Sequence, residues 1–231
     1  MDDLKWERYG AAAGVIFVVL IVVGALISGS PPSPDDSVRK IASYYEDHTG
    51  AIKAGAFLTG LGSLAFLWFL GSLWSTLRRS DDTRRLATIA TAGGIVGLIT
   101  AVTAFALNAT VAIAIDSTGA TASVNPKFIY LLSGVIGGMG NFGIAALVIA
   151  VGVASLRTRV FPEALGWASL VIALGWIIGG LVVVTDSGFP FVVGFITFLV
   201  WLIWVLVISF FLFRPPGEPA APPAPSTAST P

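Results

Sequence analysis

The sequence contains no cysteine and only one histidine among its 231 residues. The absence of cysteine excludes disulfide bonds, thiolate catalysis and every cysteine-based zinc or iron–sulfur site. Charged residues are also scarce, at 11% of the chain, whereas soluble domains usually carry about 25%. Because 55% of the residues are hydrophobic, too few polar groups remain to cover a water-soluble surface.

The chain also lacks a basic block. Its 13 Lys and Arg residues balance 13 Asp and Glu residues, so the formal net charge is zero. A protein that binds nucleic acid needs clustered cations to neutralise successive phosphates. We therefore expect no nucleic-acid partner.

Long uncharged stretches are what the sequence has in abundance. A helix needs roughly 20 apolar residues to cross about 30 Å of hydrocarbon, and in lipid its backbone must satisfy its own hydrogen bonds. Six stretches reach this length, at about 9–28, 54–77, 86–115, 128–156, 164–185 and 189–213. The sequence thus predicts an all-α, polytopic membrane protein with six transmembrane helices. The third and fourth are longer than needed and are expected to tilt or to extend past the headgroups.

The first stretch has an alternative interpretation as a secretory signal, because Lys5 and Arg8 precede it and small residues lie near its end. Its apolar run is longer than the 7–15 residues of a typical signal core. In addition, Ile27 disrupts one cleavage frame. Both features favour an uncleaved span.

The orientation follows from the distribution of Lys and Arg in short loops, which are enriched on the cytoplasmic side. With residues 1–8 inside, nine cations fall on the cytoplasmic side, and the remaining four are Arg39, Lys40, Lys53 and Lys127. The cytoplasmic set is Lys5, Arg8, Arg78, Arg79, Arg84, Arg85, Arg157, Arg159 and Arg214. We therefore predict a multi-pass protein of the cell membrane with both termini in the cytoplasm.

The outer loop, residues 29–51, is long enough to hold structure of its own. Ser33 as N-cap and Pro34 at the first position predict a short amphipathic helix over 34–48, with Gly50 as its C-cap. One face of this helix would carry Val38, Ile41, Ala42 and Tyr45. It would lie on the outer headgroups or across the mouth of the bundle, either as a lid or partner-docking element or as a solvated connector.

The carboxyl-terminal residues 214–231 have seven prolines and no hydrophobic residue larger than alanine. Such a segment cannot bury a core, so we predict a disordered, Pro-rich cytoplasmic tail. Its PxxP spacings also suit an aromatic groove on a partner, but no flanking arginine adds specificity.

Two groups of motifs resemble a known family. The first comprises Pro31-Pro32-Ser33-Pro34-Asp35-Asp36, Tyr44-Tyr45, Gly62-Ser63-Leu64-Ala65-Phe66-Leu67-Trp68-Phe69-Leu70-Gly71 and Leu77-Arg78-Arg79. The second is Phe161-Pro162-Glu163-Ala164-Leu165-Gly166-Trp167, which opens the fifth span. Over residues 10–213 the chain resembles multi-span membrane proteins of actinobacteria that are grouped under a domain of unknown function. The resemblance implies a bacterial membrane protein and no particular catalytic residue.

Ionisable side chains are absent from the middle of every predicted span, where a charge would cost several kcal/mol. Lys53, Asp116, Glu163 and Asp186 all fall at helix ends. Proton pumps and many ion-coupled transporters need such groups at depth, so this absence argues against both. Transport of a neutral solute stays open.

The polar residues deep in the spans are Asn141, Thr103, Asn108 and Thr100. Asn141 lies roughly 20 Å below Lys127, and Thr103 roughly 20 Å below Asp116. If spans three and four form an antiparallel hairpin, the two residues are therefore at one level. The simpler interpretation is an intramembrane contact between helices, worth about 0.6 kcal/mol on average. The alternative is a contact with a substrate.

Glycine is concentrated in span four, around Asn141, at positions 134, 137, 138, 140 and 143. The pairs Gly134–Gly138, Gly93–Gly97 and Gly175–Gly179 have the spacing that lets helix backbones approach closely. Close packing explains these glycines most simply. A broken helix that forms a binding site, as in transporters, is the alternative.

The sequence gives little indication of a metal site or a catalytic site. His48 lies beside Glu46 and Asp47 in the outer loop, but a metal needs converging ligands rather than scattered solvated groups. The chain has no G-x-S-x-G, P-loop or HExxH motif. We therefore expect no catalytic residue, no metal and no cofactor.

Taken together, these patterns predict a non-enzymatic protein of a bacterial plasma membrane with an accessory or assembly role. Its partners would be the lipid bilayer and either another membrane protein or a second copy of the chain. The alternative is a transporter or channel for a small neutral or apolar solute, which would use the glycine-rich fourth span and Asn141.

Overall fold

The computed structural model describes residues 3–118, 125–185 and 188–213, and within these residues it contains helices and no strands. The described helices are α1 (Asp3–Ser28), α2 (Val38–Leu77), η1 (Asp81–Thr83), α3 (Arg84–Thr118), α4 (Pro126–Thr158), α5 (Glu163–Gly180), η2 (Leu181–Val183) and α6 (Gly188–Phe213). Six helices in this part of the chain are long and apolar enough to cross a membrane. The protein is therefore an all-α, polytopic membrane protein, as predicted.

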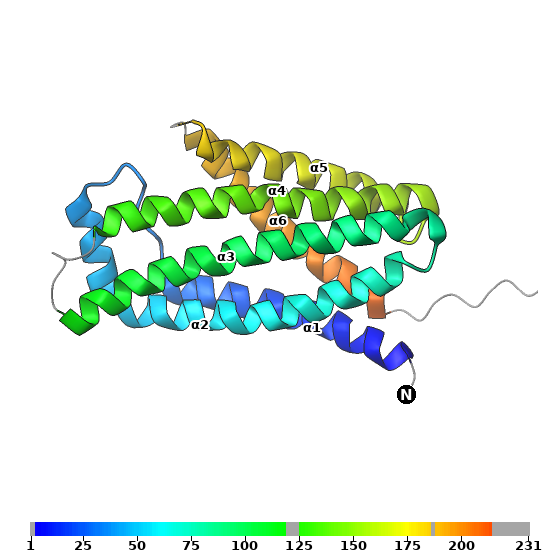
Figure 1. Cartoon of the computed structure of the whole chain (residues 1–231), viewed down its shortest axis with the longest axis horizontal. Helices are drawn as coiled ribbons and strands as arrows, with labels where there is room; N and C mark the ends of the chain where they lie inside the picture. Colours follow the sequence, from blue (N-terminus) through cyan, green and yellow to red (C-terminus); the bar gives the residue numbers. More distant parts are fainter. Residues whose placement is uncertain (1–2, 119–124, 186–187, 214–231) are drawn as a thin grey trace, which may run out of the picture.

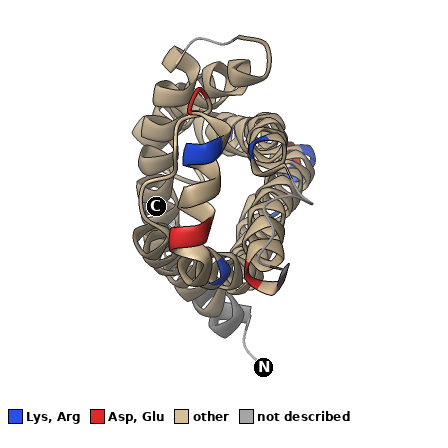
Figure 2. Cartoon of the chain, turned by 90° about the vertical axis from the view of Figure 1, so that its left-hand side faces the viewer, with Lys and Arg blue, Asp and Glu red and all other residues tan. Residues whose placement is uncertain are grey.

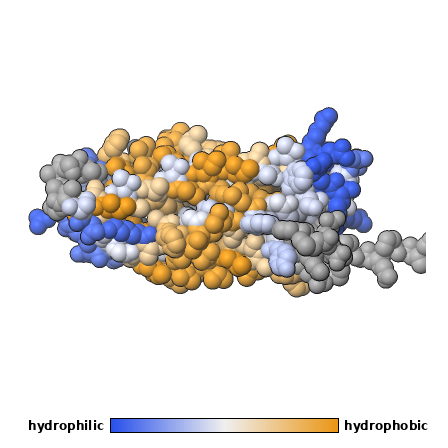
Figure 3. Space-filling view, turned by 60° about the horizontal axis from the view of Figure 1, so that its bottom comes forward, coloured by the Kyte–Doolittle hydropathy of each residue, from blue (hydrophilic) through white to orange (hydrophobic). Residues whose placement is uncertain are grey.

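The long helices run side by side along one axis (Figure 1), and each packs against its neighbours in the chain. Helix α6 returns to α1, so the six helices close into a ring when viewed along the axis (Figure 2). Helix α2 makes further contacts with α4 and α6 across the ring. On the face shown in Figure 3, hydrophobic side chains cover the middle of the molecule and hydrophilic residues gather at both ends.

The two ends of the bundle differ in their chemistry. We call one the arginine end, because the turns that follow α2 and α4 carry Arg78, Arg79, Arg84 and Arg159 there. Arg159 closes α4 in the left-handed conformation, with φ 53°, and its N–H donates to the Ser155 carbonyl at 2.9 Å. The start of α1 and the end of α6 lie at the same end (Figure 1).

Aromatic side chains fill the interior toward the arginine end. In this main core, Trp201 packs against Phe17 and Phe66 with ring centroids 5.7 and 5.8 Å apart, and it also touches Trp176. Along α4 the main core extends from near the arginine end to Ile144, about 21 Å from Thr158 at about 1.5 Å per residue. Beyond this depth a smaller buried cluster forms around Tyr45 and Val111.

The opposite end is covered by residues 29–47, which we call the cap segment. Its helical part lies across the ends of α3 and α4 (Figure 1). Ile41 and Tyr45 are fully buried against Val111 and Ala112. These two positions of the predicted apolar face are therefore confirmed, whereas Val38 is 50% exposed.

The predicted start of the outer helix was wrong, whereas its predicted end at residue 48 is confirmed by the break in helical geometry at His48. The helix begins at Val38 instead of residue 34, and Ser37 is its N-cap. Ser33 forms a turn instead: it accepts a backbone hydrogen bond from Asp36 at 3.0 Å, and its own N–H donates to the Asp36 carboxylate at 2.8 Å. At the other end, no cap forms at Gly50. The helix kinks at His48, with φ −118° and ψ 17°, and continues into the second span.

Candidate functional site

Asn108 joins three helices near the cap end. Its carbonyl oxygen accepts a hydrogen bond from the Tyr45 hydroxyl of the cap segment. Its amide nitrogen donates to the Ser133 hydroxyl of α4 at 3.0 Å and to the Ala104 carbonyl one turn back on α3 at 2.8 Å. Because both halves of the amide are occupied within the protein, Asn108 serves to hold α2, α3 and α4 together.

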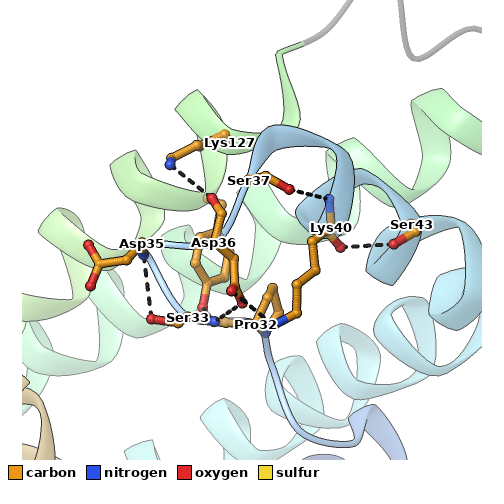
Figure 4. A network of polar contacts seen from close by, with 9 residues as sticks. Pro32, Ser33, Asp35, Asp36, Ser37, Lys40, Ser43 and Lys127 are labelled. Carbon is orange, nitrogen blue, oxygen red and sulfur yellow. Dashed lines mark hydrogen bonds and ion pairs between the residues drawn. The ribbon is translucent and has the colours of Figure 1, made fainter.

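Further polar contacts fasten the cap segment to the bundle. The Tyr130 hydroxyl of α4 donates to the Pro32 carbonyl at 2.5 Å, and Lys127 donates to the Asp36 carbonyl at 2.9 Å (Figure 4). The Tyr44 hydroxyl donates to the Ser28 carbonyl at the end of α1 at 3.0 Å. Together with the Asn108 contacts, these bonds form what we call the cap network.

The cap network includes an ion pair between Asp36 and Lys40, 2.9 Å apart (Figure 4). The hydrogen bond from Lys40, followed by that from the Ser33 backbone N–H, holds the pKa of the Asp36 carboxyl below its usual value of 3.8. The two residues are four positions apart, and the pair lies at the start of the cap helix.

His48 lies at the kink of α2 and is occupied by local contacts. Its ring stacks on Tyr44 with centroids 4.8 Å apart, and its Nδ1 lies 3.0 Å from the Tyr44 carbonyl oxygen. Among the described residues, no three His, Asp or Glu side chains come together as metal ligands. Asp186, which the sequence placed at a helix end, lies outside the described residues, as does the tail 214–231.

Thr103 and Asn141 do not contact each other. The Thr103 hydroxyl donates to the Ile99 carbonyl of its own helix at 2.8 Å. Gly140 faces Thr100 and Leu147 faces Gly93, and this register places Asn141 roughly level with Ile99. Thr103 is therefore about 6 Å farther along the axis, or four residues at about 1.5 Å each. The expectation that the two lie at one level was wrong, because the register of the hairpin cannot be inferred from hydropathy.

Asn141 stands on a face of α4 that is partly open. Its side chain makes no hydrogen bond within the described part of the chain, although its amide nitrogen approaches Gly179 of α5. A Cβ added at Gly134 or Gly137 would meet no atom within 4 Å. We call Gly134, Gly137 and Asn141 the open face. Seven and fourteen residues after Asn141, the same side of α4 carries Val148 and Ser155, and both are fully buried.

Most of the paired glycines do bring helices together, as their spacing predicted. A Cβ on Gly93 would lie 2.5 Å from the Gly143 carbonyl oxygen, and one on Gly97 would meet Ile144. Gly175 and Gly179 likewise meet Thr197 and Gly194 of α6. The two members of the pair Gly134–Gly138 differ. Gly138 packs against η2, whereas Gly134 has no neighbouring atom within reach of an added Cβ.

The main core contains donors that sequence reasoning missed. The Trp204 indole N–H donates to the Ser169 hydroxyl at 2.8 Å. The Nε1 atoms of Trp176 and Trp201 are buried without a partner within the described residues. Such donors are hard to recognise in a hydrophobic stretch, because tryptophan has a large apolar ring system that also carries an indole N–H. The sequence did not identify Tyr45 and Ser133 as partners of Asn108, because it does not give the register between neighbouring helices.

Comparisons with protein-family models, with curated proteins and with solved structures found no match to this chain. The resemblance to actinobacterial multi-span membrane proteins therefore stays a prediction.

Proposed function

We propose that the chain is a non-enzymatic accessory or assembly subunit of a bacterial plasma membrane, with both termini in the cytoplasm. The Asn141 amide on the open face, which has no hydrogen-bond partner among the described residues, carries this proposal. An amide in hydrocarbon seeks a partner, and hydrogen bonds between membrane helices contribute up to about 1.7 kcal/mol. A transmembrane helix of another protein that carries a polar side chain at this depth would satisfy Asn141.

Two features support this role over that of a conduit. Glycines without neighbours leave room for a second backbone to approach, which is how membrane helices associate. Toward the arginine end, Trp201 and its aromatic neighbours occupy the interior. The arginine-rich turns at one end of the bundle support a cytoplasmic position for that end.

Co-purification from native membranes in mild detergent tests the proposal. Asn141→Leu should reduce the amount of the co-purified partner by at least about fivefold, which corresponds to about 1 kcal/mol. Thr103→Val is the matched control, because it also removes a polar atom at depth but one that is bonded within its own helix. A partner that is retained equally by Asn141→Leu, in a variant of unchanged thermal stability, would refute the role of the open face.

A transporter of a small neutral solute is the second candidate, since the same open face offers space beside an amide. This role requires water at Gly137, whereas the accessory role places lipid or a helix there. The chain has no cysteine, so a single Gly137→Cys variant can be probed with a polar thiol reagent. Rapid labelling at Gly137, but not at the open glycine Gly71 in a Gly71→Cys control, would favour transport.

The orientation needs its own measurement. A reporter that is active only in the cytoplasm, fused after Phe213, should be active if α6 ends inside. Activity only of an external reporter at the same point would reverse the assignment of both termini.

A further inference from the structure

A groove runs between α2 and α3 on the outer surface of the bundle. Its volume is about 330 Å³, at the lower end of the range for ligand pockets. Small residues form its floor: Ala56 and Gly60 come from α2, and Ala106 and Ala109 come from α3. A Cβ on Gly60 would meet nothing within 4 Å, so the space in front of this glycine is empty of protein.

The groove offers no free hydrogen-bond donor from its hydroxyl groups. Thr59 donates to the Gly55 carbonyl at 2.9 Å, and Thr110 donates to the Ala106 carbonyl at 2.8 Å. Both hydroxyls are thus paired within their own helices. The remaining walls are apolar, including Val102 and Ile113. An apolar occupant fits this lining, and a polar solute does not.

An ion pair lies at the cap end of the groove. Lys53 is one turn before Ala56 and Asp116 is one turn after Ile113, and the Lys53 ammonium lies 2.5 Å from the Asp116 carboxylate. The side chains are 35% and 61% exposed. An ammonium has three N–H donors, so Lys53 has others to offer to a phosphate.

The length of the groove matches one leaflet of a bilayer. From Val102 to Ile113 the lining follows α3 for about 16 Å, and half of a hydrocarbon core is about 15 Å. A site that is charged at one end, apolar along its length and as deep as one leaflet has the dimensions of a phospholipid. We propose that the α2–α3 groove binds one phospholipid, with an acyl chain along Gly60 and Ala109 and the headgroup at Lys53 and Asp116.

The charge at the mouth also selects among headgroups. Lys53 and Asp116 together are neutral and form a fixed dipole. Phosphatidylethanolamine complements this pair, because its phosphate can face the Lys53 ammonium while its own ammonium faces the Asp116 carboxylate. The anionic headgroup of phosphatidylglycerol would leave Asp116 facing a like charge. The groove therefore prefers the zwitterionic lipid.

Native mass spectrometry of the full chain tests this site. The protein is released from nanodiscs that contain equal amounts of phosphatidylethanolamine and phosphatidylglycerol, and the retained lipids are counted. We expect one retained phospholipid, predominantly phosphatidylethanolamine. Gly60→Leu fills the groove from α2 without a steric clash. It should lower the retained fraction roughly tenfold, equivalent to about 1.4 kcal/mol.

Three further variants complete the experiment. Gly71→Leu is the matched control, because Gly71 is another open glycine of α2 that lies outside the groove, and this variant should retain lipid like the unmodified chain. Ala109→Leu fills the groove from α3 and should repeat the loss. Asp116→Asn leaves Lys53 as a lone cation and should shift the preference toward phosphatidylglycerol.

The proposal is overturned if both filling variants retain lipid as the unmodified chain does. It is equally overturned if Asp116→Asn leaves the headgroup preference unchanged, because the headgroup then lies elsewhere. A dimer released without lipid, and disrupted by Gly60→Leu, would assign the groove to a second copy of the chain instead.

Discussion

Toward the arginine end the interior of the bundle is filled by large apolar side chains, whereas toward the cap end the same helices present glycine and polar groups. Helix α4 displays both behaviours on one side: Val148 and Ser155 are fully buried, and Gly134 is exposed. In lipid, association depends on close packing and on hydrogen bonds between helices rather than on water exclusion. The arginine end relies mainly on close packing, and the cap end relies mainly on hydrogen bonds between helices.

This difference separates a well-packed region from one that is free to bind. The rings around Trp201 pack against one another in the buried interior, and such packing resists local opening. The groove and the open face, in contrast, both lie beyond the depth of the main core. Space for a ligand or a partner is therefore found in the cap half of the molecule.

The largest effect is expected from Trp201→Ala in the main core. Trp201 is 4% exposed and touches several rings, and truncating a buried tryptophan costs about 3–5 kcal/mol through the cavity that it leaves. On the same helix toward the cap end, Phe195 is 57% exposed. Phe195→Ala should stay within about 0.5 kcal/mol of the unmodified chain. Denaturation in detergent micelles, followed by circular dichroism, measures both changes.

Equal losses for the two substitutions would mean that the main core is not the tighter region. The same result would remove the physical contrast between the two ends of the bundle.

A second contrast lies on α4. A Cβ on Gly143 would lie 2.8 Å from the Gly93 carbonyl oxygen, so Gly143→Val must push the α3 and α4 backbones apart. Overpacking of this kind costs about 1–3 kcal/mol and occasionally more. Gly137→Val meets open space, and the exchange of glycine for valine in a helix carries little penalty of its own. The midpoint of thermal unfolding should fall only for Gly143→Val.

A comparable fall for Gly137→Val would show that the open face is closed by protein, and the assembly role of that face would lose its basis.

The same regions show which features of the fold could be predicted from the sequence alone. The six spans could be predicted from the length of the uncharged stretches, because lipid requires every crossing segment to be a long apolar helix. The first predicted span, 9–28, coincides with the span found at Tyr9–Ser28. Glycine spacing correctly indicated the close approach at Gly93 and Gly97. The same spacing failed at Gly134, because a pattern gives the separation of small residues and not the direction in which they face.

The polar contacts were the least accessible to sequence reasoning. Asn108 was singled out as a deep polar residue, yet its partners depend on the helix register and on the kink at His48. Gly50 looked like a helix end because glycine is common there, but the break in helical geometry lies at His48, and Gly50 belongs to the helix that follows the kink. Local signals identify the residues, whereas the pairing is decided by packing.

Tyr45→Phe tests the cap network with a smaller expected effect. The substitution keeps the buried ring and removes the hydroxyl that donates to Asn108, a loss of about 1 kcal/mol for a typical hydrogen bond. Because the bond holds the cap segment, the change should appear as faster hydrogen exchange in the helix after Ser37, with little change around Trp201. Tyr9→Phe is the control, since Tyr9 is 64% exposed and far from the cap. Uniformly faster exchange in both regions would contradict a local role for Asn108.

The smallest effect concerns Asp36 and the pH. Its pKa is lowered in the folded chain, so the ionised carboxylate stabilises the cap segment at pH values above the usual 3.8. This contribution is lost as the pH falls through the lowered pKa. Cleavage of the cap segment by an acid-active protease should therefore rise on acidification, and Asp36→Asn should already be cleaved faster above pH 3.8, with a weaker dependence on pH. If Asp36→Asn and the unmodified chain share one pH profile, the Lys127 and Tyr130 contacts hold the cap without help from this carboxylate.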